Sequence, residues 1–447
     1  MNILFVSLGC DKNLADTEMM LGLLRKKGYT FTDDEEQADI VIVNTCCFIG
    51  DAKEESIQTL LEMAELRKAG RLKALIAAGC LSQRYQKEIR KEIPEVDALV
   101  GTMALEDIAA AVEAALEGRG GSYYRDLNAP PAVCRERIVT TGGHYAFLKI
   151  AEGCDKHCTY CIIPKVRGSY RSIPMEVLEA QAEKLAEDGV RELILVAQET
   201  TLYGADLYGK KCLPELLHRL ARIQSLKWIR ILYCYPEEIT EELIETIAGE
   251  PKVCHYLDIP VQHASDRVLK RMGRRTTQEE LRKQIGRLRE RIPDICLRTT
   301  LISGFPGETQ EDFEELYRFV NEMEFDRLGV FPYSREEDTA ADLLPDHIAQ
   351  EIKESRRDEL MELQQAVVCD KAEEMIGREL TAMIEGKIAD EEVYVARTYR
   401  DAPNVDGYLF VNTGRNLETG NFVKVLVTGS REYDLIGELA ENREDNS

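Results

Sequence analysis

The stretch that decides the fold of this chain is Glu152-Gly153-Cys154-Asp155-Lys156-His157-Cys158-Thr159-Tyr160-Cys161. Three thiolates at the spacing CxxxCxxC can each bind one iron of a cubane iron-sulfur cluster and leave the fourth iron open. A zinc site would normally need four protein ligands, and no second CxxC or HxxxH lies nearby. A cysteine cluster without a ligand is a poorer explanation, because the intervening residues are polar. The stretch therefore predicts an iron-sulfur cluster with one reactive iron.

The size and cysteine usage of the chain restrict its class. It has 447 residues, too many for one hydrophobic core. The sequence contains no apolar run of roughly eighteen residues and opens on a predicted strand, so neither a membrane span nor a signal peptide is expected. Thirteen cysteines, most of them single in apolar segments, are not typical of a disulfide framework. These features favour a protein of the reducing cytoplasm.

The charge balance bears on the partner. The chain has 81 acidic and 57 basic residues, a formal net charge of −24. Structured nucleic acid is usually bound by a basic face, whereas an acidic chain favours a basic protein. The excess can also be solvated surface alone, and an acidic chain can still carry a local basic patch.

The N-terminal part of the chain, residues 1–125, alternates predicted strands and helices. Buried strands are expected at residues 3–8, 40–43 and 75–78, with an amphipathic helix after the first strand. This order predicts a parallel α/β sheet. Residues 126–143, with two prolines, are expected to form a linker.

Two further units are expected after the linker. In residues 144–375, apolar runs alternate with amphipathic helices and predict an open partial barrel of six βα units, with its active site at the carboxyl ends of the strands. In residues 376–441, short alternating runs at residues 380–384, 393–396, 408–411 and 422–427, separated by glycines, predict a small antiparallel barrel. Residues 442–447 are expected to be disordered. The six barrel strands are expected at residues 145–150, 193–197, 229–233, 257–261, 297–302 and 328–331.

A second set of cysteines follows the three N-terminal strands. Cys10, Cys46 and Cys80 are separated by 36 and 34 residues, about one βα repeat each. The carboxyl ends of parallel strands meet at one edge of a sheet, where ligands commonly gather. A second three-thiolate site is therefore possible. Coincidence stays open, because free cysteines are often simply buried, and Cys47 could replace Cys46.

The combination of these three units resembles the methylthiotransferase branch of the radical S-adenosylmethionine (SAM) enzymes, whose last module is the TRAM domain. The resemblance implies SAM and two 4Fe-4S clusters, a SAM-cleaving one on Cys154, Cys158 and Cys161 and a sulfur-donating one on the second set. It also implies a low-potential electron donor such as flavodoxin or ferredoxin. The motifs that carry it are Ser7-Leu8-Gly9-Cys10, Asn44-Thr45-Cys46, residues 145–161, Ile162-Ile163-Pro164 with Arg167-Gly168, and Gly304-Phe305-Pro306-Gly307-Glu308-Thr309.

The resemblance also suggests residues that contact SAM. Each of them could instead be a polar or aromatic group of the barrel core that its neighbours satisfy. The expected contacts are Tyr160, the turn at Ser303 and Phe331 for the adenine, Gln198 and Glu199 for the ammonium, Gln262 for the ribose and Arg298 for the carboxylate.

Two substrates compete within the branch. The stretches Gln262-His263-Ala264-Ser265-Asp266 and residues 197–204 are similar to members that modify the β-carbon of an aspartate in protein twelve of the small ribosomal subunit. Members that modify tRNA typically carry Gln-Ser-Gly-Ser instead. One departure is Glu199, where the ribosomal-protein members more usually have aspartate.

The charge of the last unit supports the protein substrate. Between Gly377 and Ala440 we count seven basic and eleven acidic residues, a net charge of −4. Acidic loops suit a basic ribosomal protein better than RNA, although RNA contact is not excluded. The alternatives are a tRNA adenosine methylthiotransferase with the same chemistry and a non-catalytic iron-sulfur binding or sensing protein.

Overall fold

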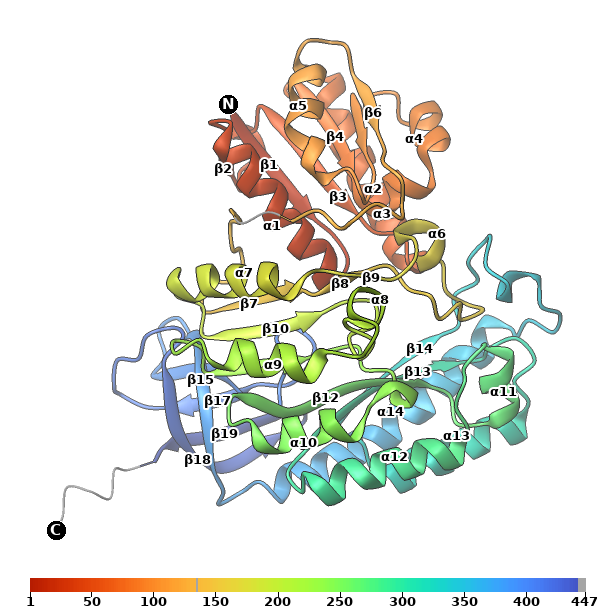
Figure 1. The fold of residues 1–447 in the computed structure, drawn as a ribbon, viewed down its shortest axis with the longest axis vertical. Helices are drawn as coiled ribbons and strands as arrows, with labels where there is room; N and C mark the ends of the chain where they lie inside the picture. The colour runs from red at the N-terminus through yellow and green to blue at the C-terminus, as the bar shows by residue number, and fades with distance from the viewer. Residues whose placement is uncertain (134–135, 441–447) are drawn as a thin grey trace.

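Six parallel strands form the N-terminal sheet in the computed structural model, which describes residues 1–133 and 136–440 (Figure 1). Their order in the sheet is β2-β1-β3-β4-β5-β6. All three strands that the sequence predicts are present, and β2, β5 and β6 extend the sheet beyond them. The residues expected to be disordered, 442–447, lie outside the described residues. The strands are β1 (Asn2–Ser7), β2 (Thr30–Thr32), β3 (Ile40–Thr45), β4 (Ala74–Ala78), β5 (Ala98–Val100) and β6 (Gly121–Tyr123).

Helices cover both faces of this sheet. One face packs on α1 and α5, and the other on α2, α3 and α4, so the central strands β3, β4 and β5 are buried on both sides. This is why their sequences are continuous apolar runs and do not alternate. The helices are α1 (Asp11–Lys26), η1 (Glu35–Gln37), α2 (Gly50–Lys68), α3 (Gly79–Arg84), α4 (Gln86–Glu92), η2 (Leu105–Asp107) and α5 (Ile108–Leu116).

The second sheet also has six parallel strands, in the order β14-β13-β12-β11-β10-β7. Its two edge strands, β7 and β14, do not pair with each other, so the sheet is an open partial barrel with helices outside it, as the sequence predicts. All six predicted strands are present. They are β7 (Tyr145–Lys149), β10 (Glu192–Val196), β11 (Trp228–Ile231), β12 (Val253–Gln262), β13 (Cys296–Ser303) and β14 (Arg327–Pro332).

Short elements hold the cysteine loop, and longer helices surround the barrel. The loop lies between β8 and α6, and β8 pairs with β9 in a separate ribbon. Within the described residues, no helix is long and apolar enough to cross a bilayer. These elements are β8 (Ala151–Glu152), α6 (Ile163–Arg167), β9 (Arg171–Ser172), α7 (Met175–Glu187), α8 (Ala205–Tyr208), α9 (Leu213–Ala221), η3 (Pro236–Glu238), α10 (Glu241–Gly249), α11 (Asp266–Arg271), α12 (Gln278–Arg291), α13 (Gln310–Met323), η4 (Ala341–Leu343) and α14 (Gln350–Glu373).

A closed five-stranded barrel ends the described chain. The sequence predicts four of its strands, and β19 is an additional one. Most pairs are antiparallel as predicted, but β17 and β19 pair in parallel. The strands are β15 (Glu379–Lys387), β16 (Val393–Thr398), β17 (Leu409–Asn412), β18 (Phe422–Arg431) and β19 (Asp434–Leu439).

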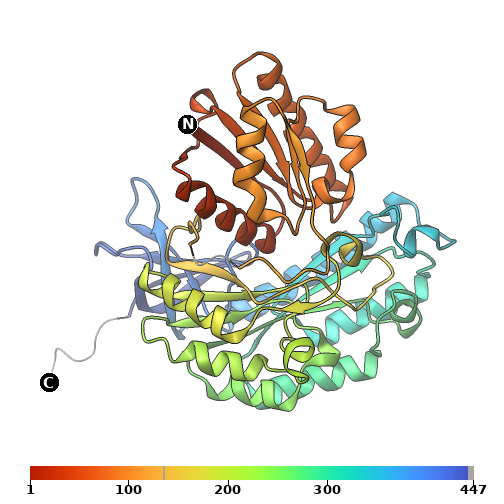
Figure 2. The same cartoon turned by 45° about the horizontal axis from the view of Figure 1, so that its top comes forward.

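The N-terminal unit lies over the carboxyl ends of the barrel strands (Figures 1 and 2). The loop after β14 contacts one side of the N-terminal unit. Ser334 Oγ accepts a hydrogen bond from the backbone N–H of Gly50 at 3.0 Å, and Glu336 pairs with Lys53 at 3.1 Å and Arg84 at 3.0 Å. These contacts bring the cysteine edge of the N-terminal sheet toward the mouth of the barrel.

The C-terminal barrel closes the opposite end through a buried ion network. Glu192, at the start of β10, pairs with Arg230 at 2.7 Å and with Arg397 of β16 at 2.8 Å, and all three side chains are 0% exposed. Arg230 also donates to the carbonyl oxygen of Tyr399 at 2.6 Å. Burial alone would raise the pKa of Glu192, but Arg397 and Arg230 lower it below its ordinary value. The network therefore connects the five-stranded C-terminal barrel to the amino ends of the strands of the partial barrel.

We predict that Glu192→Gln lowers the free energy of unfolding by about 3–5 kcal/mol, because it leaves the buried guanidinium of Arg230 without a counter-charge and leaves Arg397 with Glu385 as its remaining carboxylate partner. Denaturant unfolding measures the change. Glu418→Gln, in an exposed turn of the C-terminal barrel, is the matched control. Equal unfolding midpoints for the two variants would show that the network does not stabilise the fold.

Candidate functional site

The cysteine loop is held in place by backbone contacts. The N–H of Cys154 donates to the carbonyl oxygen of Gly168 at 3.1 Å, and the N–H of Thr159 donates to that of Met272 at 2.9 Å. Gly153 has φ +78°, and a Cβ there would lie 2.0 Å from the carbonyl oxygen of Ser169. Only glycine fits this position. The loop therefore has a fixed path before any ligand binds.

The three thiols of this loop suit a cluster better than a single metal ion. Cys154 and Cys158 are buried, and Cys161 is partly exposed. In the part of the chain that the structure describes, no three Cys, His, Asp or Glu side chains are placed to hold one metal ion. The cysteine ligands of a cubane each bind a different iron atom and need no common centre. Burial raises the pKa of Cys154 to about 12, so a metal must displace the thiol proton to bind.

Two acceptor oxygens beside this loop lack a hydrogen-bond partner. Gln198 and Glu199 follow β10, and Gln198 Nε2 donates to Glu152 Oε1 at 2.9 Å. Gln198 Oε1 and Glu199 Oε2 are buried without a hydrogen bond, and Lys156 Nζ lies 3.9 Å from the latter. The ammonium group of SAM could donate to both oxygens. These two residues therefore fit the predicted ligand.

Three other predicted SAM contacts have different surroundings. Arg298 already pairs with Asp258 at 2.8 Å and lies 3.6 Å from Asp406, so its guanidinium is committed to protein carboxylates. Ser303 Oγ is buried and donates to a backbone carbonyl at 2.9 Å, which leaves its backbone as the group available to a ligand. Gln262 has φ +73°, a strained conformation for a non-glycine residue and one that is often found at functional sites.

The aromatic residues form a chain beside the last cysteine. Tyr160 packs edge-on against Phe305, with ring centroids 6.5 Å apart, and Phe305 packs against Tyr333 at 5.3 Å. Phe331 stays 49% exposed on β14. The structure thus places Tyr160 against Phe305 in the turn after Ser303 and leaves Phe331 as a separate exposed ring.

The second cysteine set lies at the carboxyl edge of the N-terminal sheet. A Cβ on Gly9, which has φ +87°, would lie 2.6 Å from Cys46 Cβ and 2.8 Å from its Sγ, so the turn before Cys10 packs directly on Cys46. Cys10 is exposed, whereas Cys46 and Cys80 are buried. This contact favours Cys46 over its neighbour Cys47 as the partner of Cys10.

Arg167 joins Cys80 to Glu152, the residue two before Cys154, and no role for it was predicted from the sequence. Its Nη2 lies 3.5 Å from Cys80 Sγ, and its Nη1 pairs with Asp16 of α1 at 2.7 Å and with Glu152 at 3.1 Å. All of these groups are buried. Glu152 lies two residues before Cys154, so one guanidinium contacts Cys80 of the second set and a residue next to the CxxxCxxC loop. The available signal in the sequence was an arginine in the short helix after Cys161. Its partners Asp16 and Cys80 lie far away in the sequence, so their contacts with it have no local signature.

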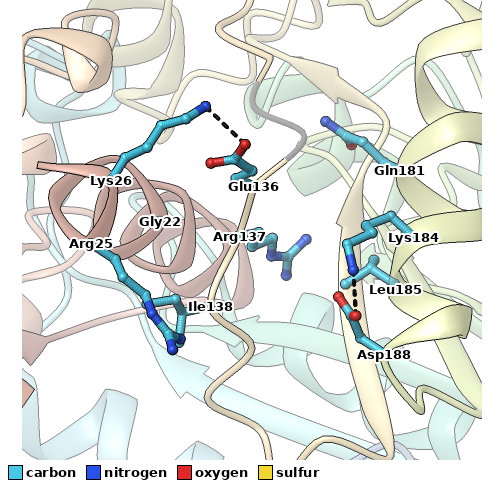
Figure 3. Close-up of a pocket in the computed structure, with 10 residues that line it drawn as sticks. All are labelled: Gly22, Arg25, Lys26, Glu136, Arg137, Ile138, Gln181, Lys184, Leu185 and Asp188. Carbon is cyan, nitrogen blue, oxygen red and sulfur yellow. Dashed lines mark hydrogen bonds and ion pairs between the residues drawn. The ribbon is translucent and has the colours of Figure 1, made fainter. Parts of the chain in front are cut away.

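A groove of about 370 Å³ lies elsewhere, between the end of α1, residues 136–138 and α7 (Figure 3). Ion pairs join Lys26 to Glu136 at 2.9 Å and Lys184 to Asp188 at 2.5 Å. No cysteine and none of the predicted SAM contacts lines it, so it is not part of the candidate site. Its lining residues are Gly22, Arg25, Lys26, Glu136, Arg137, Ile138, Gln181, Lys184, Leu185 and Asp188.

We predict that Glu199→Gln stabilises the ligand-free protein at high pH. Burial raises the pKa of Glu199 from 4.5 to about 7, and Thr201 and Lys156 offset this only in part. The stability that the protonated carboxyl contributes is fully present below its unfolded pKa and is lost as the pH rises through about 7. The advantage of the variant should therefore grow by about 2.5 kcal/mol between pH 5 and pH 8.

Denaturant unfolding at the two pH values, without SAM, measures this difference. Glu183→Gln, on the exposed face of α7, is the control and should show no such growth. An advantage of Glu199→Gln that is the same at both pH values would contradict the raised pKa.

Family models match three parts of the chain. The model described as "Uncharacterized protein family UPF0004" matches residues 2–101, that of the "Radical SAM superfamily" residues 148–320, and that of the "TRAM domain" residues 376–440. The first match contains Cys10, Cys46 and Cys80, and the second contains the CxxxCxxC loop.

Two solved structures share the fold. The chain matches the radical S-adenosylmethionine methyltransferase TsrM from Kitasatospora setae with a TM-score of 0.54 and 15% identity, over 76% of each chain. It matches the cobalamin-dependent S-adenosylmethionine radical enzyme OxsB with a TM-score of 0.53 and 14% identity, over 81% of this chain and 56% of that one. At such low identity, these matches concern the fold alone.

Sequence relatives are much closer. The chain is 60% identical over 437 residues to "Ribosomal protein uS12 methylthiotransferase RimO" of Lachnoclostridium phytofermentans, covering 98% of this chain and 99% of the relative. It is 49% identical over 439 residues to the protein of the same name from Clostridioides difficile, with the same coverage. With this identity along almost its whole length, and with a radical SAM domain at its centre, the chain belongs to the RimO family of radical SAM methylthiotransferases.

Proposed function

We propose that this chain transfers a methylthio group to the β-carbon of an aspartate in ribosomal protein uS12. The observation that supports this most is the pairing of two three-cysteine sets through one buried arginine. Arg167 contacts Cys80 Sγ at 3.5 Å and the carboxylate of Glu152 beside the CxxxCxxC loop at 3.1 Å. A sulfur-inserting enzyme needs a radical generator and a sulfur donor close together. The relatives that carry the uS12 name align with 98% of this chain.

The two cysteine sets have different roles in this proposal. Cys154, Cys158 and Cys161 hold the cluster that binds SAM, and Cys10, Cys46 and Cys80 hold a second 4Fe-4S cluster. Bound together, SAM and the first cluster supply one-electron chemistry that generates a carbon radical. The chain positions the reactants and excludes water, and the hydrogen abstraction needs no general base. The electrons come from a low-potential donor such as flavodoxin or ferredoxin.

The proposed SAM contacts follow from the hydrogen bonds that are open. Gln198 Oε1 and Glu199 Oε2 accept from the ammonium, because they have no other partner. Tyr160 lies beside the adenine, next to the Phe305 ring. Glu308 fixes the turn after Ser303, since its Oε2 accepts from the N–H groups of Gly304 at 2.8 Å and Phe305 at 3.1 Å.

Gln262, Ser303 and Phe331 stay proposed as contacts to the ribose and the adenine. Arg298 is a weaker candidate for the carboxylate, because Asp258 already binds it.

The stretch Gln262-His263-Ala264-Ser265-Asp266 distinguishes the members that modify a ribosomal protein from those that modify tRNA, and it is part of the core. His263 is fully buried, and its Nδ1 accepts from the N–H of Ser265 at 3.0 Å. Ser265 Oγ donates to Asp312 at 2.6 Å. We infer that this motif acts through the shape of the loop after β12 and does not contact the substrate directly. The acidic C-terminal barrel favours a basic protein over RNA.

The proposal also includes the division of the chain and its location. We propose an N-terminal domain of residues 1–125, a linker of residues 126–143, a radical SAM domain of residues 144–375 and a TRAM domain of residues 376–441. The cytoplasm is the proposed compartment, because cluster assembly needs reduced thiols.

Mass spectrometry of ribosomal proteins and tRNA from cells with and without the gene tests the substrate. We expect uS12 to lose its methylthio mass increment when the gene is deleted, while tRNA nucleosides stay unchanged. Restoring the gene should restore the increment. Loss of a methylthio nucleoside with unchanged uS12 would replace this proposal by the tRNA function. If neither changes and the reduced protein makes no 5′-deoxyadenosine from SAM, the non-catalytic alternative is favoured.

Iron analysis tests the second cluster. Replacing Cys154, Cys158 and Cys161 by alanine should leave about four irons per chain, against about eight in the wild type, because each cubane holds four. Alanine at Cys212, Cys254 and Cys296, which we propose not to be ligands, is the matched control and should keep about eight. An iron content near zero in the first variant would remove the second cluster from the proposal.

A further inference from the structure

Lys12 lies where the N-terminal domain meets the mouth of the barrel. It is two residues after Cys10, in the first turn of α1, and is only 7% exposed. Its Nζ lies 3.3 Å from the centroid of the Tyr233 ring, at the carboxyl end of β11. Tyr233 has φ +61°, and its hydroxyl donates to Asp11 Oδ2 at 3.4 Å. The ammonium group therefore lies between the second cysteine set and the end of a barrel strand.

Lys12 differs from the other buried lysines beside the cysteine sites. Lys149 pairs with Glu152 at 2.8 Å and also with Asp16, and Lys156 pairs with Glu238. Among the described residues, no carboxylate oxygen lies within 4.0 Å of Lys12 Nζ. Its nearest partner is an aromatic face. Two of the three lysines thus form ion pairs within the chain, whereas Lys12 has only a longer-range attraction to the neighbouring Asp11.

A buried ammonium without an ion pair is costly, and a cation–π contact and the more distant carboxylate of Asp11 offset only part of that cost. Such a group suits an anion that another molecule brings. The proposed substrate supplies one, because its reacting carbon is adjacent to a carboxylate. A cluster held by three thiolates is itself anionic, so a carboxylate placed next to it needs a cation nearby. Lys12 is the cation that follows Cys10.

We propose that Lys12 binds the side-chain carboxylate of the substrate aspartate and selects aspartate over asparagine. This inference rests on the proposed function. An ammonium donates a charge-assisted hydrogen bond to a carboxylate, whereas the neutral amide of asparagine offers a weaker acceptor. A site built around such a pair rejects the neutral isostere, because the buried charge is then left unpaired.

The experiment compares two forms of recombinant uS12, one with the target aspartate and one with asparagine in its place. Binding to the reconstituted full-length enzyme is measured by calorimetry, and modification of the aspartate form by mass spectrometry. We expect the wild type to bind the aspartate form about 10- to 100-fold more tightly. Lys12→Gln should bind both forms alike, and Lys12→Arg should keep part of the preference.

Two controls separate selectivity from folding. Lys27→Gln, just beyond the exposed end of the same helix, should keep the full preference for aspartate. Iron analysis shows whether Lys12→Gln has assembled both clusters. If Lys12→Gln loses iron, the affinities of the wild type and of Lys12→Arg for the two forms of uS12 are compared instead. Equal affinity of the wild type for the two forms overturns the inference.

The outcomes distinguish this inference from the proposed function. If the wild type leaves uS12 unmodified, the proposed function fails and the role of Lys12 fails with it. If the wild type modifies uS12 and Lys12→Gln still prefers aspartate, the role of Lys12 alone fails. A third outcome concerns the reduction potential of the second cluster, measured with Cys154, Cys158 and Cys161 replaced by alanine. If Lys12→Gln changes this potential but keeps the preference for aspartate, Lys12 compensates the charge of the cluster and the inference is overturned.

Discussion

The guanidinium of Arg167 is the constraint on which the arrangement of the two cysteine sites depends. It is fully buried between Asp16 of the N-terminal domain and Glu152 of the barrel, so separating these domains would leave buried charges without partners. Breaking such a pair by removing one partner typically costs about 3–5 kcal/mol. Because Arg167 also contacts Cys80 and lies six residues after Cys161, the same interaction sets the position of one cysteine set relative to the other. The distance between the two sites is thus a property of the fold.

Buried ion pairs also position the other units of the chain relative to one another. Each unit has its own apolar core, and the contacts between units include ion pairs of Glu336 with Arg84 and of Glu192 with Arg397. Ion pairs depend strongly on geometry, whereas apolar surfaces tolerate sliding. We infer that the cores stabilise the units and that the buried ion pairs fix their relative positions. A cysteine edge that faces a barrel mouth needs this kind of precision, because radical transfer depends on short distances.

The sequence predicts the elements that carry the sites, because their local signals are strong. The barrel strands and the three cysteine-bearing strands are buried apolar runs, and the cysteine spacings do not depend on distant contacts. Strand β5 has only three residues, and β19 starts with Asp434 and contains Gly437, so their local patterns are weak. The parallel pairing of β17 with β19 is set by closure of the barrel and has no local signature. For the same reason the ion pairs of Arg167 and Arg298 could not be predicted, since their carboxylate partners come from other units or strands.

Residue type alone does not separate the scaffold from the ligand site, but the pattern of hydrogen bonds does. The acceptors around Arg167 are all paired, and so is the guanidinium of Arg298. At the end of β10, by contrast, Gln198 Oε1 and Glu199 Oε2 are buried without a hydrogen bond. Each such group typically costs about 1–3 kcal/mol, and folded proteins rarely keep one without a reason. Lys156, 3.9 Å from Glu199, is too far to donate a hydrogen bond and offsets the charge only in part. With the contacts proposed above, a bound ammonium that donates to both oxygens would recover this cost, and this is why we propose that the unsatisfied groups mark the ligand contacts.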